Sequence, residues 1–124
     1  MGRLTTLFDT SLLAEPTEGR TPNLDGDCAV SVITIGELHA GVLLARDDAT
    51  QASRLRRLAA VLDMATVLDV DRAITARYGE LRAAACRAPS NDLWIAATAL
   101  AHDLQLLTAD KGQATLPNVR VQLV

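Results

Sequence analysis

The fold is decided by residues 90–110, which read SNDLWIAATALAHDLQLLTAD. Ser90 or Asn91 can cap a helix, and Asp92 then lies in its first turn, where exposed N–H groups and the helix dipole favour an anion. The apolar run that follows is typical of a short buried strand, and Asp110 comes at its carboxyl end. Because open α/β sheets build their sites at that edge, the two acids can meet in one pocket.

Strands and helices alternate along the rest of the chain. Strands are predicted for the short apolar runs at 4–8, 28–32, 66–70 and 119–124. Helices are predicted by apolar periodicity at 33–45, 47–63 and 71–85. Residues 15–27 contain two prolines and two glycines, which indicates a surface loop. We therefore expect an α/β fold of three layers, a central and mostly parallel sheet flanked by helices.

The composition limits the class of protein. A chain of 124 residues with 49% hydrophobic content suits a single domain over residues 1–124 with a core of its own. Its net charge of -3 argues against a nucleic-acid-binding protein that relies on bulk positive charge. The two cysteines lack a metal-type spacing, so we expect reduced thiols and a cytoplasmic protein. No apolar run approaches the roughly 18 residues of a membrane span, so no membrane partner is expected.

Two further acids follow predicted strands. Asp9 comes directly after the strand at 4–8, and the Ser11 hydroxyl could orient its carboxylate; the alternative is that Asp9 only caps a short helix. Glu37 lies on an apolar face of the helix at 33–45, where an ionised carboxylate is costly unless it is paired or bound to a metal. The alternative for Glu37 is a solvated surface position.

The predicted topology can bring four acids to one edge of the sheet: Asp9, Glu37, Asp92 and Asp110. Carboxylates at contact distance cannot all stay ionised without cations between them. Mg²⁺ or Mn²⁺ would solve this, since hard cations take oxygen ligands and retain water. Such ions can bind a phosphodiester, deprotonate a water and stabilise the leaving oxygen. The sequence therefore predicts a Mg²⁺ (or Mn²⁺) site at this edge.

At these positions the sequence resembles the PIN-domain ribonucleases and, within them, the VapC toxins of bacterial toxin–antitoxin pairs. The matching pieces are LFDTS at 7–11, VITIGEL at 32–38, SNDLWIAA at 90–97 and LTAD at 107–110. Their order and spacing cover nearly the whole chain. The resemblance places the family's acidic quartet on Asp9, Glu37, Asp92 and Asp110, and its supporting hydroxyls on Ser11 and Thr108.

This resemblance implies a metal-dependent endoribonuclease that forms a homodimer and is inhibited by a cognate antitoxin, whose tail occupies the site. Arg46, Arg87 and Lys111 are candidates for contacts with RNA phosphates around the rim. The sequence departs from the family at residues 111–114, which read KGQA and lack the Phe that is often found there.

Two other classes of protein are considered. A phosphatase of the haloacid dehalogenase type needs a second acid two residues after its nucleophile, where this chain has Ser11. A response-regulator receiver needs an acidic pair before Asp9, and none is present. The remaining alternative is a non-catalytic PIN-like module that binds RNA or protein, in which the acids are caps and solvated charges. Glu37 on its apolar face argues against that alternative.

Overall fold

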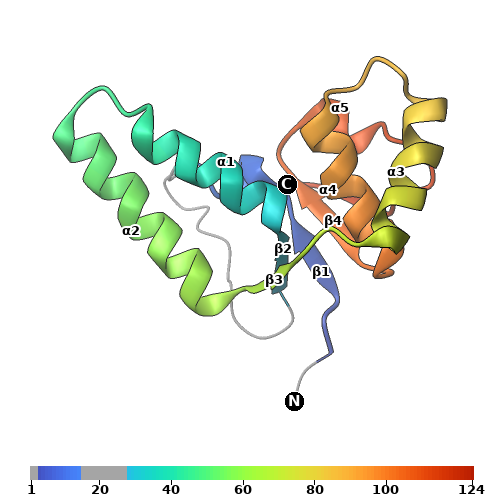
Figure 1. Cartoon of the computed structure of the whole chain (residues 1–124), viewed down its shortest axis with the longest axis horizontal. Coiled ribbons are helices and arrows are strands. Elements are labelled where there is room, and N and C mark those ends of the chain that lie inside the picture. Colours follow the sequence, from blue (N-terminus) through green and yellow to red (C-terminus); the bar gives the residue numbers. More distant parts are fainter. Residues whose placement is uncertain (1–2, 15–27) are drawn as a thin grey trace.

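The computed structural model describes residues 3–14 and 28–124, so the predicted loop at 15–27 lies outside the described residues. Within them, a five-stranded sheet has the order β3-β2-β1-β4-β5, and each neighbouring pair is parallel (Figure 1). The strands are β1 (Thr6–Phe8), β2 (Cys28–Ser31), β3 (Thr66–Leu68), β4 (Gln105–Thr108) and β5 (Val121–Leu123). Parallel pairing places the carboxyl ends of all these strands at one edge of the sheet.

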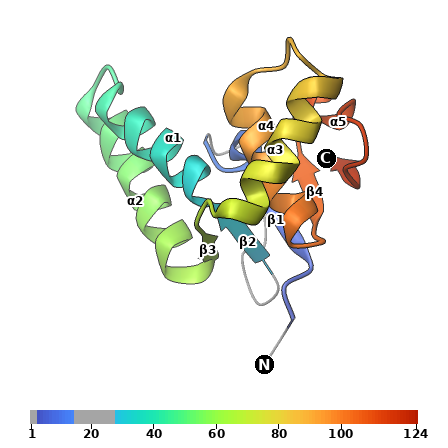
Figure 2. The same cartoon turned by 45° about the vertical axis from the view of Figure 1, so that its right-hand side comes forward.

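Helices cover both faces of this sheet (Figures 1 and 2). The helical elements are η1 (Thr10–Leu12, a 3₁₀ turn), α1 (Val32–Leu43), α2 (Asp48–Met64), α3 (Arg72–Ala84), α4 (Ser90–Ala101) and α5 (Lys111–Ala114). Neighbouring strand residues point to opposite faces, so Leu7 packs in the core cluster of α3 and α4, whereas Phe8 packs in that of α1 and α2. The predicted three-layer α/β fold is confirmed.

Helix α4 lies against the sheet through small side chains. Ala96 and Ala99 are fully buried, as expected for the helix face that carries Asp92. The predicted cap by Ser90 or Asn91 is wrong, because the helix begins one residue earlier and Pro89 is its N-cap, without a side-chain capping hydrogen bond. Ser90 Oγ instead accepts a hydrogen bond from Arg82 Nη2 at 3.0 Å.

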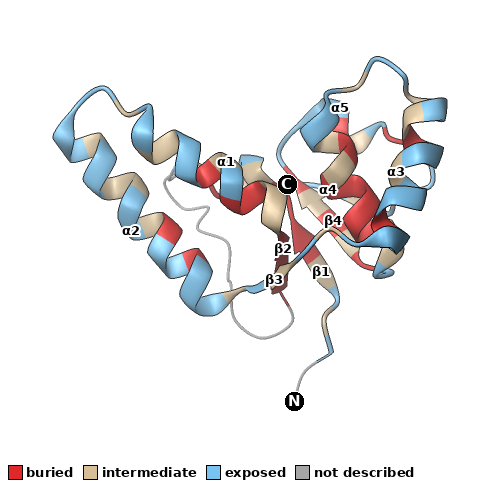
Figure 3. Cartoon of the chain, in the orientation of Figure 1, coloured by how far each residue is buried: buried red, intermediate tan, exposed pale blue. Residues whose placement is uncertain are grey.

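Helix α2 packs alongside α1 at the outside of the molecule, and only a narrow face of it is covered (Figure 3). Leu58 and Val61 are buried, but Leu55 and Leu62 are 54% and 48% exposed. Leu55, Leu58, Ala59 and Leu62 recur at helical spacing, but of these four only Leu58 is buried. A helix that packs on one other helix buries a narrower stripe than a helix that lies flat on a sheet.

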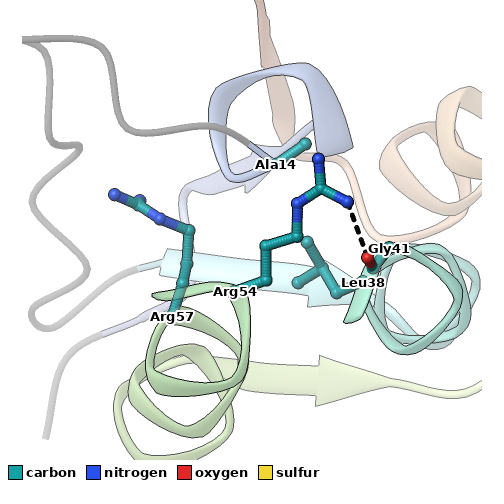
Figure 4. Close-up of a pocket in the computed structure, with 5 residues that line it drawn as sticks. All are labelled: Ala14, Leu38, Gly41, Arg54 and Arg57. Atoms are coloured by element: carbon teal, nitrogen blue, oxygen red, sulfur yellow. Dashed lines mark hydrogen bonds between the residues drawn. The ribbon is translucent and has the colours of Figure 1, made fainter. Parts of the chain in front are cut away.

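Arg54 of α2 reaches across to α1 and fixes the two helices together. Its Nη1 donates to Gly41 O at 2.7 Å, beside a cavity of about 160 Å³ that Leu38 and Arg57 also line (Figure 4).

Among residues 3–14 and 28–124, none of the helices combines the length and the apolar character that a membrane crossing needs.

Candidate active site

Asp9 is held rigidly at the carboxyl end of β1. Its backbone N–H donates to Leu107 O at 2.8 Å, and the residue is only 3% exposed. The hydroxyls of Ser11 and Thr108 each donate to Asp9 Oδ2 at 2.7 Å. The two hydroxyls predicted from the sequence to support the site therefore both orient this carboxylate.

The chain that leaves β4 is tied to the same hydroxyls. Ala109 N donates to Ser11 Oγ at 2.9 Å, and Asp110 N donates to Thr108 Oγ1 at 3.0 Å. Asp110 is exposed and caps α5, since its Oδ1 accepts from Gly112 N at 2.8 Å. The short helix α5 was not predicted, and the Asp110 cap accounts for its start.

Glu37 extends from α1 toward η1 and is half-buried. Its Oε1 accepts a hydrogen bond from Thr10 Oγ1 at 2.7 Å, and Thr10 Oγ1 lies 3.0 Å from Thr34 Oγ1. The sequence did not single out Thr10, although a hydroxyl directly after the strand-end Asp9 was a usable signal. Thr10 therefore connects Glu37 to the segment that carries Asp9.

Asp92 lies in the first turn of α4 and is half-buried. Burial of its carboxyl, followed by the negative charges of Asp9, Asp110 and Glu37 in that order of importance, raises the pKa of Asp92 from 3.8 to about 6. A neighbouring charge acts this way only at short range. The structure therefore places Asp92 within electrostatic range of each of the three other predicted acids.

This donor set suits a hard divalent cation, because it offers carboxylate oxygens from four separate elements. Within residues 3–14 and 28–124, however, no three His, Cys, Asp or Glu side chains stand together in an arrangement that would hold an ion. The carboxylates of Glu37 and Asp110 instead accept hydrogen bonds from Thr10 Oγ1 and Gly112 N, respectively. Repulsion between like charges also favours this separation.

The three candidate RNA-binding cations are exposed, but they lie in different places. Lys111 directly follows Asp110 at the start of α5, and Arg87 lies in the segment that joins α3 to α4. Arg46 follows α1 at the end away from β2, at the turn into α2 (Figure 1). Lys111 is thus next to Asp110 in the sequence, whereas the whole of α1 separates Arg46 from the edge of the sheet at the end of β2.

Arg82 stiffens the segment that leads into α4. Its guanidinium donates to Tyr78 Oη, to Ser90 Oγ and to the carbonyls of Cys86 and Ala88. The Tyr78 ring in turn stacks on Trp94, with ring centroids 3.9 Å apart. Trp94 therefore packs against α3 through Tyr78, on a face of α4 away from Asp92.

Gln113 is the second site residue that sequence reasoning missed. It is fully buried on α5, and its Nε2 donates to the backbone carbonyl of Asp92 at 3.0 Å. The signal was the departure at residues 111–114, where the chain reads KGQA. This hydrogen bond joins the helix capped by Asp110 to the first turn of the helix that carries Asp92.

Comparisons with known proteins agree with this architecture. Residues 6–119 match the PIN domain family. The chain is 42% identical over 96 residues to Ribonuclease VapC4 of Mycobacterium tuberculosis, covering 74% of this chain and 73% of that protein. It is 35% identical over 117 residues to Ribonuclease VapC5 of the same organism, covering 89% and 86%.

Solved structures share the whole fold. A crystal structure of VapBC-5 from Mycobacterium tuberculosis, a member of the VapBC family of toxin–antitoxin systems, superposes with a TM-score of 0.79 at 33% identity, covering 97% of each chain. The crystal structure of FitAcB from Neisseria gonorrhoeae gives a TM-score of 0.79 at 28% identity, covering 94% of this chain and 96% of that one. The chain therefore belongs to the PIN-domain family and, within it, to the VapC proteins.

Proposed function

We propose that this protein is a cytoplasmic, metal-dependent endoribonuclease that acts as the toxin of a toxin–antitoxin pair. The observation that carries the proposal is the position of Asp92 in the first turn of α4, at the sheet edge where the neighbouring strands β1 and β4 lead into Asp9 and Asp110. Burial first, and then the charges of the three other acids, raise the pKa of Asp92 to about 6. Such a concentration of negative charge costs stability and is typical of functional sites. Similarity to two proteins named ribonucleases supports RNA as the substrate.

Asp9 and Asp92, with Glu37 and Asp110, would hold the cation in this proposal. When bound, Mg²⁺ or Mn²⁺ supplies an activated water and a Lewis acid for the phosphodiester. Ser11 and Thr108 both contact Asp9 Oδ2, so they fix this carboxylate and leave Oδ1 for other contacts. Thr10 holds Glu37 by its hydroxyl, and Gln113 holds the backbone of Asp92.

The test is cleavage of a panel of structured RNAs by the purified protein with Mn²⁺ or Mg²⁺, with chelator, and by the Asp92→Asn variant. We expect cuts that need the metal and disappear in the variant. Asn keeps the shape of the side chain but removes its charge, so loss of cleavage with an intact fold would report on chemistry. Full activity in chelator or in Asp92→Asn would contradict the proposal.

We also infer a cognate antitoxin and a homodimer. Large apolar side chains are exposed on and just after α1 and on α2: Leu43, Leu44, Leu55 and Leu62. An exposed apolar set of this kind is typical of a protein interface. The similar VapBC-5 structure is described as part of a toxin–antitoxin family, which supports the antitoxin.

The homodimer is tested by light scattering. One chain has a mass of 13.2 kDa, and the purified protein should scatter with twice that mass. The mass of a single chain at all protein concentrations would refute the homodimer.

A second candidate is a non-catalytic PIN-like module that binds RNA or protein. The observation that favours it is that no three acidic side chains in the described part of the chain stand ready to hold an ion. Thermal unfolding separates the two candidates, because an ion that binds only the folded state raises the melting temperature by mass action. A melting temperature unchanged by Mn²⁺, together with no cleavage, would favour the module.

A further inference from the structure

Three side-chain oxygen atoms form a chain of contacts between helix α1 and the segment that follows β1. Thr10 Oγ1 lies 2.7 Å from Glu37 Oε1 and 3.0 Å from Thr34 Oγ1. Glu37 and Thr34 are three residues apart on α1, so they share one face of that helix. Thr10 begins the 3₁₀ turn that comes directly after Asp9. The contacts therefore join the element that presents Glu37 to the element that presents Asp9.

The chemistry of the three groups fixes the direction of both hydrogen bonds. Thr10 has one hydroxyl proton, so it can donate fully to only one of its two neighbours. A carboxylate can only accept, and the shorter contact is the one to Glu37 Oε1, so Thr10 donates there. The Thr34 hydroxyl then donates to Thr10 Oγ1. Both hydroxyls therefore point the same way, from Thr34 through Thr10 to Glu37.

The hydroxyl of Thr34 depends on this contact. Its side chain is 0% exposed, so it has no surface water to bond. Within the described ranges, 3–14 and 28–124, Thr10 is the one hydrogen-bond partner of Thr34 Oγ1. A buried hydroxyl without its partner carries the cost of an unsatisfied polar group. The contact therefore holds the Thr10 side chain in the orientation that serves Glu37.

Thr34 is a fixed point, whereas Glu37 is not. Thr34 lies in the first turn of α1, whose N-cap Ser31 is also the last residue of β2 and accepts a hydrogen bond from that turn at 3.0 Å. Glu37 is half-buried, and the position of its longer side chain depends on its partners. A hydroxyl that accepts one hydrogen bond also becomes a stronger donor for the next. Thr34 therefore strengthens the hold of Thr10 on Glu37.

We propose that Thr34 is a positioning residue of the metal site, which acts through Thr10 to hold Glu37 by Oε1 and leave Oε2 available for a divalent cation. No described residue donates to Glu37 Oε2. Groups that orient a metal-binding side chain typically change metal affinity by about 10–100-fold. Because Thr34 is one contact further away, we expect the lower end of that range. The inference rests on the proposed function, which supplies the cation.

The test measures the binding of Mn²⁺ alone, without RNA, through the electron paramagnetic resonance signal of the free ion. Thr34→Val keeps the shape of the side chain and removes the hydroxyl, and it should raise the Mn²⁺ dissociation constant about tenfold. Thr34→Ser keeps the hydroxyl and should bind Mn²⁺ like the wild type.

Thr98→Val is the matched control. Thr98 is also a fully buried threonine in a helix, and its hydroxyl donates to Trp94 O of the same helix at 2.8 Å. This variant loses a buried hydrogen bond without touching an acid, so it should lose stability and keep the Mn²⁺ affinity of the wild type. A purely structural role for Thr34 would make the two valine variants behave alike.

A double-mutant cycle shows whether Thr34 acts through Thr10. Thr10→Val should weaken Mn²⁺ binding by itself, and adding Thr34→Val should then have no further effect. If Thr34→Val does not fold, Thr34→Ala removes the same hydroxyl without adding a contact and takes its place in the cycle.

Four results would overturn the inference: unchanged or tighter Mn²⁺ binding in the Thr34 variant, an equal loss in Thr98→Val, an effect that adds to that of Thr10→Val, or no Mn²⁺ binding by the wild type. The proposed function fails separately. Metal-dependent RNA cleavage, with wild-type Mn²⁺ affinity in Thr34→Val, would leave a ribonuclease and remove the positioning role. A Mn²⁺ site that depends on Thr34, without RNA cleavage, would leave the positioning role and remove the nuclease.

Discussion

Replacing Asp92 with Asn should stabilise the metal-free protein. In the native structure the carboxyl has its pKa raised from 3.8 to about 6, first by burial and then by the charges of three neighbouring acids. A raised pKa means that the ionised form is less favourable in the folded chain than in the unfolded one. The rise corresponds to about 3 kcal/mol at 1.36 kcal/mol per pKa unit. Solvent screening at a half-buried carboxyl reduces this to about 1–2 kcal/mol.

The size of this stabilisation depends on pH in a defined window. Below pH 3.8 the carboxyl is protonated in both states and costs nothing, and above about pH 6 it is ionised in both and the full cost applies. The advantage of Asp92→Asn should therefore be present above pH 6 and fade as the pH falls toward 4. For a chain of this size, each kcal/mol of added stability should raise the melting temperature by roughly 3–6 °C.

The assay is thermal and urea unfolding in chelator at several pH values, with Asp63→Asn as the control, since Asp63 is exposed near the end of α2. Excess Mn²⁺ should reverse the order, because the wild-type protein would gain more from ion binding than the variant. Destabilisation by Asp92→Asn in chelator above pH 6, or an advantage that does not change with pH, would refute the electrostatic coupling.

Further predictions concern the support of the site and the rest of the chain. Thr108→Val removes a buried hydroxyl from Asp9 Oδ2, and urea unfolding should show a loss of about 1–3 kcal/mol; no loss would contradict its role in holding the carboxylate. Cys28 is buried with its pKa raised to about 11, whereas Cys86 is exposed, so a thiol reagent should label only Cys86 in the native protein and both after unfolding. Labelling of both thiols in the native state would argue against this burial. Arg82→Met removes the bonds that hold the segment before α4 and should lower the melting temperature and speed proteolysis there; equal proteolysis rates would count against it.

The parallel sheet, and the edge of it that carries the acids, could be predicted from the sequence because both follow from the alternation of strands and helices. Parallel strands end at one edge, so Asp9 after β1 and Asp110 after β4 were expected at the same edge. The structure adds that β1 and β4 are direct neighbours in the sheet. Glu37 and Asp92 each lie in a helix that begins near that edge. Only the pattern of strands and helices was needed, and no side-chain detail.

Other features depend on packing that the sequence pattern does not specify. The apolar spacing of α2 gives no reason to prefer Val61 over Leu62 as the buried residue, because that choice depends on where α1 lies. The N-terminus of α4 looked like a side-chain cap, but Arg82 competes for Ser90 from eight residues away. Gln113 is polar on a short helix, and only the three-dimensional contact with Asp92 shows why it is buried.

A substitution at Asp9 shows whether the four acids form the catalytic centre of a metal-dependent ribonuclease. We would measure RNA cleavage in Mn²⁺ by wild-type protein, Asp9→Asn and the surface control Asp63→Asn, with unfolding curves for each. Asp9 is the most deeply buried of the four and is held by two hydroxyls. We expect Asp9→Asn to stay folded and to lose metal-dependent cleavage, and Asp63→Asn to retain it. A folded Asp9→Asn protein that cleaves RNA as fast as the wild type would contradict the assignment of Asp9 to the catalytic centre.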